Sequence, residues 1–287
     1  MKNFSRREFI YKSAASVAAV SAMSPLNFLH AKERPLISEP IGFQSWMVRE
    51  LIAKDFGGTL KMMSGLGYQT VEMCSPPGYA KHGFGSLQSL KAPEMKKIIT
   101  DAGLSCTSSH YGFNELKESG QERMDFANEL GLTQMVIASF GLPEKASLSD
   151  WKKAADEANS LGALAKKNRV QMVFHNHNIE FEKLEGKIIY DELLERLDPE
   201  LVKMQFQLWV VIAGYKAADY FKKYPGRFIS AHLSDWSGKA EEQVTLGKGT
   251  IDWKEFFKAS KVGGLKNFFV EMDLSTLKES AAYLKSL

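Results

Sequence analysis

Short apolar segments alternate with helical patterns eight times between residue 41 and the end of the 287-residue chain. Most of these segments have the length and the Val, Ile or Phe content of a buried strand. The segments lie at residues 41–46, 68–74, 104–110, 134–138, 170–175, 202–207, 228–233 and 267–271. Eight such units predict an α/β fold, a (β/α)8 TIM barrel that forms a single domain over residues 36–287. An open doubly wound sheet is the alternative, but no Gly-x-Gly-x-x-Gly motif or P-loop follows a strand.

The first 31 residues differ in composition from the rest and are predicted to be a cleavable signal peptide. Their start, Ser5-Arg6-Arg7, resembles a bacterial twin-arginine signal, and residues 14–23 are small and apolar. This apolar run is too short to cross a bilayer as a stable helix. We therefore expect export to the periplasm and a mature protein without a membrane span. An uncleaved amphipathic N-terminus is the alternative.

The charges of the chain are balanced, with 37 Lys and Arg residues against 34 Asp and Glu residues and a net charge of +3. No basic stripe is present, so nucleic acid is not an expected partner. The two cysteines, Cys74 and Cys106, lie near the ends of neighbouring predicted strands. A disulfide bond and two free thiols are both compatible with this placement, and free thiols are simpler because a barrel of this size needs no covalent link. Whether the barrel forms a homo-oligomer is left open.

Six polar side chains lie at or beside the C-terminal ends of the predicted strands. In a parallel barrel these ends meet at one mouth, where such barrels carry out their chemistry. We therefore expect the six side chains to be neighbours in a functional site. The alternative is a set of buried polar residues that only satisfy one another's hydrogen bonds. The six residues are Glu72, His110, His175, Gln207, His232 and Glu271.

The fifth predicted strand ends in two histidines, His175 and His177. Side chains of a strand alternate between its faces, so these two histidines share one face and Asn176 lies on the other. Imidazole is both a common transition-metal ligand and an acid–base group near neutral pH. Bending of the strand end by one residue would exchange the two histidines, so either can be the inner one.

Several motifs in the second half of the chain resemble the xylose isomerase-like TIM-barrel group, the sugar phosphate isomerase/epimerase family. They are His175-Asn176-His177-x-x-Glu180-Phe181, Tyr224-Pro225-Gly226-Arg227-Phe228, Ala231-His232-Leu233-Ser234-Asp235, Gly247-Lys248-Gly249-Thr250-Ile251-Asp252-Trp253 and Phe269-Val270-Glu271-Met272-Asp273. The resemblance implies a divalent metal held by Glu, Asp, His and Glu at the ends of the fifth to eighth strands. In that family the metal holds a sugar's carbonyl and neighbouring hydroxyl while carboxylates move a proton at the adjacent carbon.

Only two of the four metal ligands of the family have the same residue type in this sequence. His232 matches the seventh-strand His and Glu271 matches the eighth-strand Glu, but His175 and Gln207 stand where the family has Glu and Asp. The predicted metal ligands are therefore His175, Gln207, His232 and Glu271, with Gln207 as a weak ligand or a hydrogen-bond donor to substrate. Losing about two carboxylate charges favours Mn²⁺, Co²⁺, Ni²⁺ or Zn²⁺ over Mg²⁺. A site that has lost its metal is the alternative.

Proton transfer beside a carbonyl needs a base and a group that stabilises the enediolate. Glu271 is predicted to be both a metal ligand and the base. The predicted acid–base residues on the opposite face of the substrate are Glu72, His110 and His177. Asp235 is predicted either to contact substrate or orient His232, or else to be a surface loop acid. The predicted substrate contacts are Trp46, Asn176, Asp235 and Trp236.

Together these features predict an exported isomerase or epimerase that carries out metal-assisted proton transfer on a small carbohydrate. Export makes an unphosphorylated sugar, an inosose or an oxidised glycoside the expected substrate. One alternative is a lyase that performs β-elimination on keto-glycosides, and another is an inactive sugar-binding barrel, for which the missing acid at Gln207 argues. Phosphodiester hydrolysis is not favoured, because it needs a denser set of ligands and a basic surface.

Overall fold

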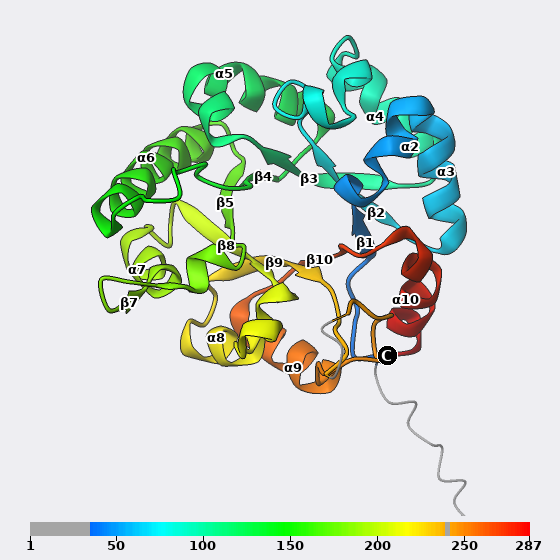
Figure 1. Ribbon diagram of the computed structural model, residues 1–287. Coiled ribbons are helices and arrows are strands. Elements are labelled where there is room, and N and C mark those ends of the chain that lie inside the picture. Colours follow the sequence, from blue (N-terminus) through cyan, green and yellow to red (C-terminus); the bar gives the residue numbers. More distant parts are fainter. Residues whose placement is uncertain (1–34, 239–241) are drawn as a thin grey trace, which may run out of the picture. The chain divides into compact units, whose positions relative to one another are not determined.

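The computed structural model describes residues 35–238 and 242–287 (Figure 1). The predicted signal peptide lies outside the described residues and stays a prediction. Within the described part of the chain, no helix is long and apolar enough to cross a membrane. Residues Leu36–Leu287 form one compact unit.

Eight parallel strands close into a barrel in the order β1-β10-β9-β8-β5-β4-β3-β2, which confirms the predicted TIM barrel. The strands surround a central axis and the helices lie outside them (Figure 1). Each predicted strand overlaps an observed one. The barrel strands are β1 (Ile41–Gln44), β2 (Thr70–Cys74), β3 (Ser105–Tyr111), β4 (Gln134–Ile137), β5 (Gln171–His175), β8 (Val202–Gln207), β9 (Phe228–Leu233) and β10 (Asn267–Val270).

The helices begin and end where local chemistry favours it. The Asp55 side chain accepts a hydrogen bond from Gly58 N at the start of α3, and Asp252 accepts one from Glu255 N at the start of α9. Gly67 ends α3 with a φ of 104°, a conformation that side chains with a Cβ rarely adopt. The helices are α2 (Arg49–Lys54), α3 (Phe56–Leu66), α4 (Ala92–Asp101), α5 (Phe113–Leu130), α6 (Leu148–Lys167), α7 (Ile189–Arg196), α8 (Ala217–Lys223), α9 (Trp253–Gly263) and α10 (Leu274–Ser286).

A short hairpin, β6 (Lys183–Leu184) with β7 (Lys187–Ile188), follows β5 and was not predicted from the sequence. Two-residue strands leave too little periodicity to detect. Both cysteines, Cys74 and Cys106, are free thiols.

Strand alternation separates an apolar outer face from a polar inner face, as β8 shows. Phe206 packs against the rings of Tyr220 and Phe221 on α8, so it faces outward. Gln205 and Gln207 are therefore on the inner face, where both are buried. Apolar burial between strands and helices supplies the stability of the barrel, at about 25 cal/mol per Å² removed from water. Polar side chains fill the barrel interior near the mouth.

Candidate active site

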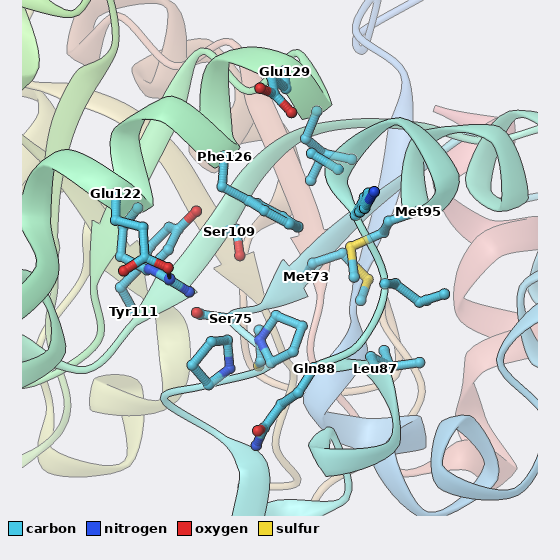
Figure 2. A pocket seen from close by; sticks show the side chains of 18 of the residues that line it. Met73, Ser75, Leu87, Gln88, Met95, Ser109, Tyr111, Glu122, Phe126 and Glu129 are labelled. Carbon is cyan, nitrogen blue, oxygen red and sulfur yellow. Dashed lines mark hydrogen bonds and ion pairs between the residues drawn. The ribbon is translucent and has the colours of Figure 1, made fainter.

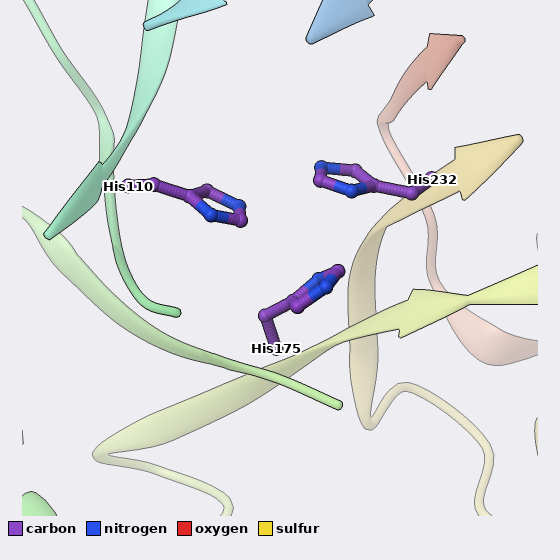
Figure 3. Close-up of side chains that lie close together, drawn as sticks. All are labelled: His110, His175 and His232. Carbon is purple, nitrogen blue, oxygen red and sulfur yellow. The ribbon is translucent and has the colours of Figure 1, made fainter. Parts of the chain in front are cut away.

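Three buried histidines point toward one another at the mouth of the barrel (Figure 3). His110 comes from β3, His175 from β5 and His232 from β9. Each offers one ring nitrogen, and these three nitrogens lie within 4.8 Å of one another. The His232 ring lies 5.1 Å from that of His110 and 4.5 Å from that of His175, centroid to centroid. We call these three residues the histidine cluster.

The carboxylate of Glu72 lies next to the histidine cluster and is completely buried. In the barrel register it is level with Ser108, two residues before His110 on β3, and so one layer deeper than the cluster. Burial alone would raise the pKa of Glu72, but the neighbouring His110 and His232 hold it well below the usual value. Its oxygens accept hydrogen bonds from Ser108 Oγ (2.6 Å), Gln205 Nε2 (2.8 Å), Gln44 Nε2 (2.7 Å) and His232 Nε2.

Gln205 determines which nitrogens of two histidines carry hydrogen. Its Oε1 lies 2.8 Å from His110 Nε2 and 2.9 Å from His175 Nδ1. An amide oxygen only accepts, so both of these nitrogens donate. When the rings are neutral, His110 Nδ1 and His175 Nε2 therefore keep free lone pairs. Burial, followed by the charges of neighbouring histidines, lowers the pKa of His175 well below its usual value, which favours the neutral ring.

His232 lies between two carboxylates. Its Nε2 donates to Glu72, and its Nδ1 lies 3.0 Å from Glu271 Oε2. Burial opposes a charge here, but Glu271 and Glu72 outweigh it and raise the pKa of His232 to about 10. In this arrangement the ring is an imidazolium that joins the two acids.

Glu271 connects the buried network to the mouth, because its side chain is 19% exposed. Gln207 Nε2 donates to Glu271 Oε2, the same oxygen that faces His232. Burial would raise the pKa of Glu271, but the charge and hydrogen bond of His232, together with the bond from Gln207, hold it below the usual value. The four predicted metal ligands thus lie together, and His110, a predicted acid–base residue, is an additional neighbour.

The mouth itself is a cavity of about 580 Å³. His177 is exposed there, with its ring centroid 4.8 Å from that of His175, so His175 is the inner histidine of the pair. Trp46 and Trp236 line the cavity, and their contact with substrate stays a prediction. Trp209 also lines the cavity and is not among the predicted substrate contacts. Its place two residues after Gln207 was the sequence feature that indicated a position at the mouth.

Glu72 is buried and does not line the mouth cavity, so this geometry does not support its predicted action on substrate. Its contacts make it a positioning residue for the histidine cluster. Asn176 is also buried away from the cavity, and its Oδ1 accepts a hydrogen bond from Gln207 N at 3.1 Å. Asn176 therefore holds the β8 strand end, and a substrate contact is not supported.

Asp235 organises the loop after β9 and does not line the mouth cavity either. A Cβ on Gly249 would lie 2.1 Å from Asp235 Oδ1, so only glycine allows the loop to approach this closely. The predicted contact of Asp235 with substrate or His232 is not supported by this geometry. Its carboxylate accepts hydrogen bonds from Trp236 N (3.0 Å), Gly247 N (3.0 Å), Gly249 N (3.1 Å), Ile251 N (3.3 Å) and Trp253 Nε1 (3.0 Å).

A second cavity of about 480 Å³ lies between the β2–β3 side of the barrel and helices α4 and α5 (Figure 2). Its walls combine apolar side chains such as Met73 and Phe126 with polar ones such as Gln88 and Glu122. Arg123 at its edge is paired with Glu122 and lies 4.0 Å from Glu115. None of the histidine cluster lines it, so this cavity is separate from the candidate site.

Glu180 supports the mouth loop from a fully buried position. Its Oε2 accepts a hydrogen bond from His177 N at 2.7 Å, whereas Oε1 has no hydrogen-bond partner among the described residues. Burial raises the pKa of Glu180 from 4.5 to about 7. The folded state therefore binds a proton that the unfolded state releases, and stability falls as pH rises from about 4.5 to about 7.

Glu180→Gln is expected to remove this pH dependence, because the amide still accepts from His177 N and carries no charge. At pH ~8 the variant should be more stable than the wild type by up to about 3 kcal/mol, and at pH ~4 by little. Urea unfolding of both proteins across this range measures the difference. The exposed neighbour Glu182, changed to Gln, is the control. Parallel stability profiles for wild type and Glu180→Gln would contradict the assignment.

Comparisons with known proteins agree with this architecture. The sequence model of a family described as xylose isomerase-like TIM barrel matches residues 60–287. An inosose dehydratase of Clostridium perfringens is 28% identical over 200 residues, which cover 58% of this chain and 67% of the relative. The crystal structure of a sugar phosphate isomerase/epimerase from Parabacteroides distasonis has a TM-score of 0.75 at 22% identity, covering 88% of this chain and 97% of that one. The IOLI protein, solved with a bound zinc atom, has a TM-score of 0.66 at 15% identity, covering 86% and 95%.

Proposed function

Because the chain belongs to the xylose isomerase-like TIM barrel family, we propose that it is a carbohydrate-active isomerase or epimerase that moves a proton at the carbon next to a sugar carbonyl. The observation that carries the proposal is the convergence of the histidine cluster and Glu271 at the barrel mouth. The relatives named inosose dehydratase and sugar phosphate isomerase/epimerase support a carbohydrate substrate.

The donor atoms at the mouth suit a divalent transition metal. His110 and His175 each keep one nitrogen free of Gln205, and Glu271 offers a carboxylate beside His232. A set dominated by imidazoles favours Mn²⁺, Co²⁺, Ni²⁺ or Zn²⁺ over Mg²⁺. Holding an ion through His232 would require this ring to give up the proton that it shares with Glu271 or Glu72. The zinc in the IOLI structure supports such a site.

A bound metal would supply a Lewis acid that polarises the sugar carbonyl. The proton chemistry is assigned to the chain's own groups. The lowered pKa of Glu271 keeps it ionised near neutral pH, and its partial exposure lets it accept a proton from the sugar carbon. His177 lines the same cavity, and its role would be to return a proton to the other face of the sugar carbon, which would complete an epimerisation. Burial lowers the pKa of His177, so the ring would have to take up this proton from solvent during the reaction.

The second candidate reaction is elimination, favoured by the name of the inosose dehydratase relatives. The C–H bond beside the carbonyl breaks and its proton goes to Glu271. A C=C bond forms, the C–O bond of the leaving group breaks, and the departing oxygen takes a proton from His177. Both candidates share the first step, so proton exchange in D₂O tests both.

Metal content tests the role of the cluster independently of activity. Protein purified without chelator is expected to contain about one equivalent of a transition metal. His232→Ala should lose nearly all of it, because this ring lies between both carboxylates. His82→Ala, on the exposed rim of the mouth, is the matched control and should keep the metal. Unchanged metal content in His232→Ala would refute the site, and no metal in the wild type would favour metal-free acid–base chemistry or a sugar-binding protein.

A further inference from the structure

We propose that the mouth takes an uncharged glycoside of two rings, with the reacting ring against the histidine cluster and the second ring stacked on Trp209. The inference rests on the proposed function for the identity of the reacting ring. It adds a second subsite, the substrate class that this subsite selects, and the residues that form it.

The second subsite is an aromatic platform formed by Trp209 and Trp236. Trp209 follows β8 in the 3-10 helix η5 (Leu208–Ala213), and Trp236 follows β9. Their rings are stacked, with centroids 5.3 Å apart and planes 15° from parallel. Trp209 is 44% exposed, and it is the only tryptophan among the exposed large hydrophobic residues of the described chain. Since Trp236 supports one face of this ring, the exposed area belongs to the other face and the edges.

The platform lies at the edge of the same cavity as the catalytic candidates. Both tryptophans line the 580 Å³ mouth together with His175, His177 and Glu271. Drug-sized ligands occupy cavities of roughly 300–1,000 Å³, so this mouth has room for more than one hexose ring. The reacting ring must reach Glu271 and the cluster, which leaves the platform for a second ring.

The charges of the mouth select a neutral ligand. Glu271 and Asp273 line it, whereas none of its described lining residues is Lys or Arg. A phosphate or a carboxylate on the second ring would therefore find no Lys or Arg side chain among the described lining residues to pair with. Neutral sugar rings present C–H faces, and these suit an exposed indole surface. In the elimination reaction the second ring would be the leaving group, which takes its proton from His177.

Equilibrium titration tests the platform without turnover. Each pair of ligands consists of a disaccharide and the methyl glycoside that carries only its reacting ring. For at least one pair, the wild type is expected to bind the disaccharide about tenfold more tightly. Trp209→Ala should lose this preference, because it should weaken binding of the disaccharide much more than binding of the methyl glycoside. Trp209→Phe should keep much of the preference. Ile212→Ala, also exposed in η5 but absent from the mouth, should leave both affinities unchanged.

The two proposals fail in different ways. Equal affinities in the wild type, or a preference that survives Trp209→Ala, overturn the platform. Absence of proton exchange on every keto-sugar, with the disaccharide preference intact and dependent on Trp209, overturns the proposed function and supports the platform. Turnover of keto methyl glycosides without any disaccharide preference supports the function and overturns the platform.

Discussion

Glu271→Gln is expected to lower kcat for proton exchange beside the sugar carbonyl by about a thousandfold. Glu271 is the carboxylate that contacts the histidine cluster and is also partly exposed at the mouth. The amide has nearly the same size but cannot accept a proton from carbon at neutral pH. Measuring deuterium incorporation from D₂O into keto-sugars follows this step directly, whether the overall reaction is epimerisation or elimination.

Asp273→Asn is the matched control for this variant. Asp273 lines the same mouth and loses the same unit of charge, but no side-chain hydrogen bond ties it to the cluster within the described structure. Its exchange rate should remain within a few fold of the wild type. Metal content of the Glu271→Gln sample then separates two roles. If the variant keeps its metal but loses exchange, Glu271 acts as the base. If the variant loses both its metal and exchange, Glu271 acts as a metal ligand. Exchange near the wild-type rate in Glu271→Gln would contradict both.

The barrel and its mouth were predictable because strands and helices have different hydrophobic periods. The same alternation predicted that His175 and His177 share one face, and their rings do lie together. It could not tell which histidine is inner, since that depends on how the chain bends after the strand. The structure resolves this: His175 is buried and His177 is exposed.

Contacts between distant residues could not be predicted in the same way. Glu72 and His232 are 160 positions apart, and their hydrogen bond depends on the stagger of the closed barrel. Gln205 is not among the predicted site residues, yet its side chain bridges two histidines and Glu72. The role of Asp235 was indicated in the sequence by two glycines of its loop, Gly247 and Gly249. The backbone N–H groups of both glycines donate hydrogen bonds to its carboxylate.

Glu72→Ala is expected to lower the free energy of unfolding by about 3–5 kcal/mol, the largest stability loss we predict for a single substitution. Removing this carboxylate leaves the His232 charge with one acid where it had two. It also leaves the buried donors of Ser108 and Gln205 without this acceptor. Unfolding in urea measures the loss, and Glu72→Gln should fall between the wild type and Glu72→Ala because it keeps part of the hydrogen bonding.

Glu279→Ala is the control for the same chemical change at an exposed position. Glu279 pairs with Lys248 at 2.9 Å on the surface, and both side chains are more than half exposed. Surface pairs of this kind contribute about 0–1 kcal/mol, so this variant should unfold almost as the wild type does. A Glu72→Ala loss no larger than that of Glu279→Ala would mean that the cluster holds its shape without the buried acid. The larger loss, by contrast, would show that this fully buried carboxylate stabilises the folded state through its contacts with His232, Ser108 and Gln205.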